Sequence, residues 1–266
     1  MVFRMRSTLL ALSLLLTAPV HAFDASGHIA ICELAWQRVS ADTRDWLART
    51  AAASPEKRFS RGCAWPDEVR NERAFEHTKV WHYVNVSRSA TSVLPGDCPA
   101  SGCVVSAIDA MSQRLLARSD DWQALFFLGH FIGDLHQPLH VSYADDRGGN
   151  RTDVRLNGEK TNLHALWDGE LLGPFKASAK ASRWQQTLTQ APHPQWTQGS
   201  LLDWASESLS LTRDIYRQYQ PKQSITTGYL SHYGPLLDER MQMAGVRLAD
   251  TLERIHEKLT KPPKMD

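Results

Sequence analysis

The chain has 266 residues, of which 42% are hydrophobic and 22% are charged, a composition that excludes a disordered or fibrous protein. Thirty Lys and Arg residues balance 29 Asp and Glu residues, so the formal net charge is +1. This balance disfavours a protein that holds duplex nucleic acid through a broad basic face, and any polyanion must be bound locally.

The first 22 residues have the pattern of a signal peptide. Arg4 and Arg6 precede an apolar run over residues 9–18, and Val20 and Ala22 occupy the two positions that a signal peptidase reads. The run is too short to span a bilayer, and no later stretch approaches the roughly 20 apolar residues that spanning requires. We therefore expect cleavage after Ala22 and a periplasmic or secreted protein that does not insert into a membrane.

Four cysteines follow the predicted cleavage site: Cys32, Cys63, Cys98 and Cys103. An even number of cysteines in an exported chain predicts two disulfides, for which three pairings are possible. We favour Cys98 with Cys103, which closes a short loop rich in Pro and Gly, and Cys32 with Cys63 by elimination. Zinc binding by the cysteines is a weaker alternative, because the chain has no C-x-x-C motif.

Apolar residues recur every three or four positions over much of the chain, the period of amphipathic helices. This period predicts helices over residues 27–39, 43–51, 104–118, 162–172, 201–219 and 236–258. A further helix is predicted to begin at the caps offered by residues 119–121 and to end near Gln137, because Pro138 disfavours helix in the residue before it. The pattern changes between residues 148 and 162, where residues 152–156 alternate and Asn157-Gly158 is a hairpin turn signal. We expect a single, mainly α-helical domain over residues 23–266 with one small β-hairpin.

Two His-Asp pairs stand at positions i and i+4 of predicted helices: His130 with Asp134, and His164 with Asp168. This spacing puts both side chains of a pair on one helix face, where they can bind one divalent ion. A single pair of this kind often arises by chance, whereas two in one chain are harder to dismiss.

Four further residues could join these pairs: His28, Asp67, His82 and His140. Each of them alone has an ordinary structural interpretation, such as a first-turn helix position for Asp67 after Pro66. Their interpretation therefore depends on the motifs around them.

Seven short motifs follow one another between residues 23 and 168. They are GH at 27–28, WPDEVR at 65–70, WHYVN at 81–85, FLGHFIGD at 127–134, QPLH at 137–140, GGN at 148–150 and NLHALWD at 162–168. In order and spacing this set resembles the extracellular type I nucleases, the zinc-dependent single-strand nucleases of fungi, plants and bacteria, which are related to bacterial zinc phospholipases C.

The resemblance implies three Zn²⁺ per chain. One would be bound by Asp67, His82, His130 and Asp134, and a second by His140, His164 and Asp168. The third would be bound by His28, Asp134 and the amino and carbonyl groups of Phe23, the first residue after cleavage. Members of the family generally begin with Trp, but the ligand atoms are backbone atoms and metal binding is expected to survive the change to Phe.

The resemblance also implies a phosphodiesterase that converts RNA and single-stranded DNA to 5′-phosphorylated mononucleotides and that has 3′-nucleotidase activity. Asp67 would orient the attacking water, while Arg70 and Asn162 would contact the phosphate. Without the resemblance, Arg70 would be a solvated surface residue and Asn162 a helix cap. Tyr83 would stack on a base and Asn85 would bind its edge, the alternative for Tyr83 being a place in the core.

Two other functions remain open at this point. A zinc phospholipase C would use much the same ligands, and an exported protein that stores zinc would need the ligands but neither Arg70 nor Asn162. The expected partners are nucleic-acid substrates, and the expected oligomeric state is a monomer.

Overall fold

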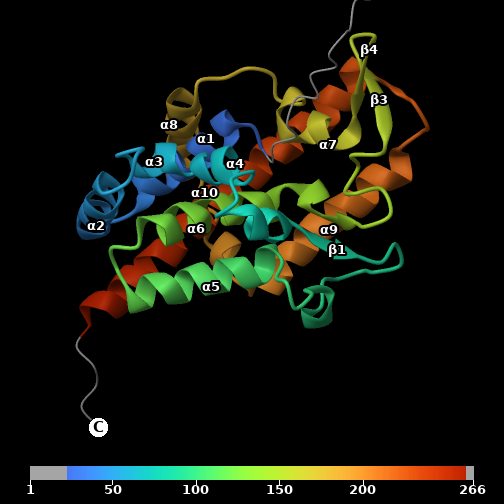
Figure 1. The fold of residues 1–266 in the computed structure, drawn as a ribbon. Coiled ribbons are helices and arrows are strands. Elements are labelled where there is room, and N and C mark those ends of the chain that lie inside the picture. The colour runs from blue at the N-terminus through green and yellow to red at the C-terminus, as the bar shows by residue number, and fades with distance from the viewer. Residues whose placement is uncertain (1–22, 262–266) are drawn as a thin grey trace, which may run out of the picture.

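Helix α6 (Trp122–His136) is the most deeply buried helix of the fold. The computed structural model describes residues 23–261, so the predicted signal peptide, residues 1–22, lies outside the described residues. Every residue of α6 from Ala124 onward is buried. Four helices pack against it, as Figure 1 shows: α1 (Ala25–Arg38), α5 (Val104–Ala117), α9 (Leu201–Gln218) and α10 (Thr227–Thr260). The side chains of α6 from Ala124 onward are thereby excluded from bulk water.

Further helices complete the described part of the chain. The remaining α-helices are α2 (Ala41–Ala52), α3 (Phe59–Gly62), α4 (Trp65–Val69), α7 (Leu163–Ala165) and α8 (Ala177–Gln190). Four 3₁₀-helices are η1 (Glu76–His82), η2 (Pro95–Asp97), η3 (Pro138–His140) and η5 (Pro194–Thr197), while η4 (Leu166–Glu170) is π-helical. The mainly α-helical fold class predicted from the sequence is confirmed.

Two small sheets lie beside the helices. Strand β3 (Asp153–Leu156) pairs with β4 (Glu159–Asn162) in the predicted hairpin, whose turn residues Asn157 and Gly158 both have positive φ. The short strand β5 (Ser224–Ile225) extends this sheet in parallel. The second sheet was not predicted: β1 (Val84–Val86) pairs in parallel with β2 (Val141–Tyr143) across more than fifty residues of sequence.

The C-terminal helix begins earlier than predicted. We expected a start at residue 236, after Pro235, but α10 begins at Thr227 and continues through the proline. A proline inside a helix removes a hydrogen bond and crowds the preceding turn. Here Tyr233 and Leu237, on either side of it, are both buried, and Tyr233 packs edge-on against Trp167. This burial offsets the cost of the proline. We also did not predict helix α8 from the sequence.

The favoured cysteine pairs are both disulfide-bonded. Cys32 of α1 is joined to Cys63, directly after α3, and Cys98 is joined to Cys103 in the loop before α5. The first bond fixes α1 against the segment that leads into α4. Among residues 23–261, no helix combines the length and the apolar character that a membrane span would need.

Candidate metal centre

Asp134 lies at the centre of a buried cluster of histidines. Nδ1 of His82 lies 3.0 Å from Oδ2 of Asp134, and Nε2 of His130 lies 3.2 Å from the same oxygen. Its Oδ1 lies 3.4 Å from Nε2 of His28 and 3.6 Å from Nδ1 of His140. One carboxylate therefore contacts side chains from α1, η1, α6 and η3.

The polar atoms of the cluster fall into three groups, and the atoms of each group lie within 4.8 Å of one another. The groups are His28, His130 and Asp134; Asp67, His82 and His130; and His140, His164 and Asp168. All members are buried, and they offer the imidazole nitrogens and carboxylate oxygens that Zn²⁺ accepts. The structure thus brings together every side chain that the sequence singled out as a metal ligand.

Backbone carbonyls orient three of the imidazoles. His130 donates from Nδ1 to the carbonyl of Cys63 at 2.8 Å, His140 to that of His82 at 2.6 Å, and His164 to that of Gly148 at 2.7 Å. Donation from Nδ1 fixes the tautomer and leaves the lone pair of Nε2 toward the centre. The rings are therefore arranged to accept a cation.

Several buried polar atoms of the cluster have no hydrogen-bond partner. They are both ring nitrogens of His28, Nε2 of His82 and His140, Oδ1 of Asp134 and Oδ2 of Asp168. Leaving such an atom without a partner costs about 1 to 3 kcal/mol. Divalent cations would satisfy these atoms together, so the residues present fit metal ions.

Burial also shifts the pKa values of three side chains in the cluster. Burial, and then the neighbouring His130, lowers the pKa of His28 to about 3. Burial, and then His140, lowers that of His164 to about 3. Burial raises the pKa of Asp168 well above its ordinary value. Neutral imidazoles are the form that binds metal, and a bound cation would restore the Asp168 carboxylate.

Close packing between α1 and α6 brings His28 to the centre. A β-carbon on Gly133 would lie 2.8 Å from Nδ1 of His28, so only glycine permits this approach. Phe23 is buried with its ring edge-on to His28, at a centroid distance of 6.0 Å. The backbone N–H of Asp24 donates to the carbonyl of Asp168 at 2.7 Å. Residues 23 and 24 are thereby held beside the metal-binding cluster.

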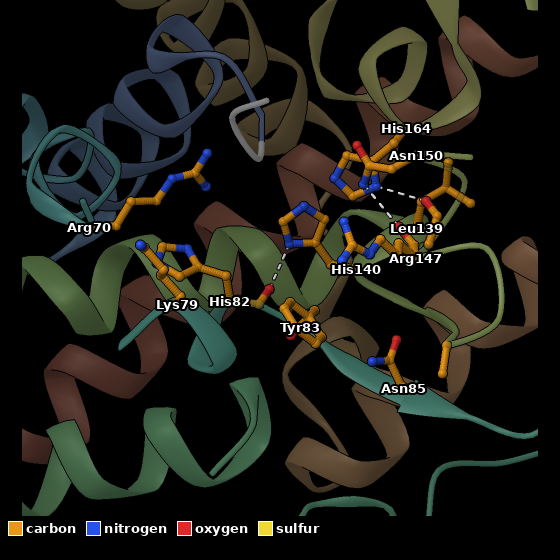
Figure 2. Close-up of a pocket in the computed structure, with 12 residues that line it drawn as sticks. Arg70, Lys79, His82, Tyr83, Asn85, Leu139, His140, Arg147, Asn150 and His164 are labelled. Carbon is orange, nitrogen blue, oxygen red and sulfur yellow. Dashed lines mark hydrogen bonds between the residues drawn. The ribbon is translucent and has the colours of Figure 1, made fainter. Parts of the chain in front are cut away.

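A cleft of about 430 Å³ opens onto the cluster, and twelve residues line it. Figure 2 shows Arg70 and His82 on one side, His164 and Asn150 on the other, and Tyr83 between them. Nη1 of Arg70 donates to Oδ1 of Asp67 at 3.0 Å. The cleft thus combines three of the inferred metal ligands with an aromatic ring and three cationic side chains, those of Arg70, Lys79 and Arg147.

The family of the chain can now be assigned. The model of the S1/P1 nuclease family matches residues 23–257, which is most of the chain. The chain belongs to this family. It is therefore a hydrolase that acts on phosphoric ester bonds, and its substrates are nucleic acids.

Curated relatives from plants and fungi agree with this assignment. Nuclease P1 of Penicillium citrinum is 30% identical, over 88% of this chain and 98% of its own length. Nuclease S1 of Aspergillus oryzae is 27% identical, over 92% and 96%. Endonuclease 3 of Arabidopsis thaliana is 28% identical, over 86% and 87%. The similarity thus extends across nearly the whole of each protein.

The residues suggested as substrate contacts have different positions in this nuclease. Arg70, Tyr83 and Asn85 line the cleft, and the side chain of Tyr83 is 38% exposed, so Tyr83 is not a core residue. Asn162 is not among the lining residues. Its Oδ1 accepts from the backbone N–H of Ala165 at 2.9 Å, so Asn162 caps α7.

We assigned no role to Gln137 from the sequence, yet its buried side chain contacts the candidate metal centre of this nuclease. Nε2 of Gln137 donates to Oδ1 of Asp168 at 2.6 Å, and its Oε1 accepts from the backbone N–H of Leu139 at 2.5 Å. Gln137 lies in the sequence between Asp134 and His140, two candidate ligands, and this position could have pointed to a role in the centre. We did not infer one, because glutamine is not a usual zinc ligand.

Proposed function

We propose that the protein is an exported trinuclear zinc nuclease that hydrolyses RNA and single-stranded DNA to 5′-phosphorylated mononucleotides and also has 3′-nucleotidase activity. The observation that carries the proposal is that three buried groups of His and Asp side chains adjoin one another, and that two of these groups contribute His82, His140 and His164 to a cleft. Arg70, Tyr83 and Asn85 line the same cleft. Nitrogen and oxygen donors of this kind suit zinc.

The ligands divide among three zinc ions as follows. One ion is bound by Asp67, His82, His130 and Asp134, and a second by His140, His164 and Asp168. The third is bound by His28, Asp134 and the backbone amine and carbonyl of Phe23. The central position of Asp134, close to both His28 and His82, supports its role as a ligand shared by two ions.

The protein's own groups position the phosphate and the water. Zinc, when bound, supplies Lewis acidity toward phosphoryl oxygens and toward water. Arg70 binds a nonbridging phosphate oxygen, and its pairing with Asp67 fixes the direction of the guanidinium. Asp67 orients the water for in-line attack, and the 3′ oxygen leaves. Asn162 does not line the cleft and its Oδ1 caps α7, so only its amide N–H₂ would be available to contact the phosphate.

Preference for single strands follows from the aromatic ring at the cleft. A base can stack on Tyr83 only after it has left a duplex, and such stacking contributes about 1 to 3 kcal/mol. Asn85, which follows Tyr83 by two residues and lies in β1, binds the edge of the same base. A paired base offers neither its face nor that edge.

Removal of the signal peptide frees one of the proposed zinc ligands. The amine of Phe23 becomes free only when the chain is cleaved after Ala22, and its ordinary pKa of about 7.7 to 8.0 allows it to lose a proton to zinc near neutral pH. The burial of Phe23 beside His28 supports this assignment. We further propose that the exported enzyme is a monomer.

One assay tests the activity directly. The processed protein is incubated with RNA, single-stranded DNA, duplex DNA and phosphatidylcholine vesicles, each with and without a chelator. We expect mononucleotides from RNA and single-stranded DNA, little product from the duplex, and none with the chelator. Hydrolysis of phosphatidylcholine in place of nucleic acid would instead identify a phospholipase C.

A further inference from the structure

A second groove, of about 430 Å³, adjoins the cleft at the metal centre. Its lining consists of Arg88, Tyr143, Ser210, Arg213, Tyr216 and Arg217. The first two come from the β1–β2 region and the other four from α9, which packs against β2 and lies beside β1 in Figure 1. We call it the arginine groove.

The arginine groove and the cleft are adjacent along the chain at two points. Tyr143 lines the groove, and the next residue, Ala144, lines the cleft. Asn85 lines the cleft, and Arg88, three residues later, lines the groove. Three residues span at most about 10 Å. A strand bound at Asn85 can therefore continue into the groove over a few nucleotides.

The floor of the groove is fixed before any ligand binds. The Arg88 guanidinium lies 4.6 Å from the ring centroid of Tyr143 and 5.0 Å from that of Tyr216. Nε of Arg88 also donates to Oδ2 of Asp145 at 2.7 Å. The hydroxyl of Tyr216 donates to the carboxylate of Asp146, which is 9% exposed. Binding here would therefore require little rearrangement of the floor.

The rim of the groove has cations available for a ligand. The lining includes three arginines and no carboxylate. Within the described residues, the exposed Arg213 forms no ion pair. Arg217 pairs with Asp214 at 2.9 Å, but its side chain is 74% exposed, and exposed pairs of this kind contribute little energy. Both guanidiniums can thus turn to an incoming anion.

We propose that the arginine groove binds the sugar-phosphate backbone of the nucleic-acid strand that leaves the catalytic cleft. The inference rests on the proposed nuclease function and adds a subsite for long substrates. Guanidinium groups bind phosphate through paired hydrogen bonds, and a chain of net charge +1 must concentrate such contacts locally. Dinucleotides end before the groove, whereas longer strands reach it.

The test compares two double variants of equal charge. Arg213→Gln with Arg217→Gln removes the rim cations of the groove. Arg49→Gln with Arg183→Gln removes two exposed arginines from α2 and α8, which lie away from α9 in Figure 1. The kcat/KM of each protein is measured on a dinucleotide and on a 12-nucleotide RNA over a range of salt concentrations.

We expect the groove variant to lose about tenfold in kcat/KM on the 12-nucleotide RNA at low salt and to keep its activity on the dinucleotide. Each lost contact to a single strand lowers the log–log salt slope by about 0.7, so the slope should fall by about 1.4. An equal loss in the control variant, an equal loss on the dinucleotide, or an unchanged 12-nucleotide rate and slope would each overturn the proposal.

A binding measurement separates this inference from the nuclease proposal. A labelled 12-nucleotide phosphorodithioate DNA keeps the charge of each phosphate and resists hydrolysis. Weaker binding by the groove variant than by the control supports the groove even if the wild-type protein hydrolyses no nucleic acid. Equal binding by the two variants contradicts the groove even if the wild-type protein is an active nuclease.

Discussion

Gln137 donates a 2.6 Å hydrogen bond to the carboxylate of Asp168, and both side chains are buried. The same amide accepts from the backbone N–H of Leu139, so one side chain links Asp168 to the turn that carries His140. Because Oδ1 of Asp168 is engaged by the amide, its Oδ2 is left toward the centre.

Replacing Gln137 by Leu should therefore weaken binding of one zinc ion by about 10- to 100-fold, the usual effect of losing a group that orients a metal ligand. Competition with a chromophoric chelator measures the affinity, and the exposed Gln190→Leu serves as control. Unchanged affinity with an unchanged melting temperature would show that Gln137 does not position Asp168.

Arg70→Ala should slow turnover by about 100-fold while all bound zinc is retained, because we propose that the guanidinium binds the phosphate and it is not among the proposed zinc ligands. Steady-state kinetics on RNA and elemental analysis give the two quantities. Arg73→Ala is the matched control, since Arg73 is exposed and does not line the cleft. Loss of zinc from the Arg70 variant would contradict a role limited to substrate.

Asp134→Ala should lose two zinc ions, whereas Asp168→Ala should lose one, because only Asp134 lies among ligands of two proposed sites. Ion counts on purified, processed protein distinguish the variants, and circular dichroism checks that each is folded. Equal losses from the two variants would argue against a shared ligand.

A protein with one extra residue ahead of Phe23 should bind about one zinc ion fewer and lose most of its activity. The added peptide bond removes the free amine that we assign to the third zinc, but leaves the buried Phe23 ring in the chain. Ion counts and RNA hydrolysis are compared with those of protein that begins at Phe23. If the extended chain bound as much zinc as the protein that begins at Phe23, the amine of Phe23 could not be a zinc ligand.

Glu207→Gln should lower the free energy of unfolding by about 2 kcal/mol. The carboxylate accepts from Arg240 at 2.7 Å and from Arg247 at 2.7 and 2.8 Å, and both arginines are buried. Breaking a fully buried pair costs about 3 to 5 kcal/mol, but the side chain of Glu207 is 40% exposed and the effect is correspondingly smaller.

The Glu207 effect should also depend on pH. Burial alone would raise the pKa of Glu207, but hydrogen bonds from Arg247 and Arg240 lower it below the ordinary 4.5. A lowered folded-state pKa gives stability that is present above pH 4.5 and is lost as the pH falls further. Denaturant unfolding should therefore show the wild-type advantage shrinking below pH 4.5. A constant advantage down to pH 3 would contradict this pairing.

The sequence predicted the local features better than the long-range ones. Pairs at i and i+4, such as His130 with Asp134, are set by helix geometry alone. The pairing of β1 with β2 joins strands of three residues each, which are too short for a periodic pattern. The predicted start of the last helix, after Pro235, was wrong because the cost of the proline inside α10 is offset by tertiary packing of Tyr233. By contrast, α8 had a readable pattern, since Ala181, Trp184 and Leu188 recur at helical spacing.

The disulfide between Cys32 and Cys63 touches the metal centre through α6. A β-carbon on Gly129 would lie 2.6 Å from Sγ of Cys63 and 2.9 Å from Sγ of Cys32, so the bond packs directly on the turn that precedes His130. His130 in turn donates to the carbonyl of Cys63. In a reducing cytosol the two thiols would separate and loosen this support. The position of His130 thus depends on a bond that forms in an oxidising compartment.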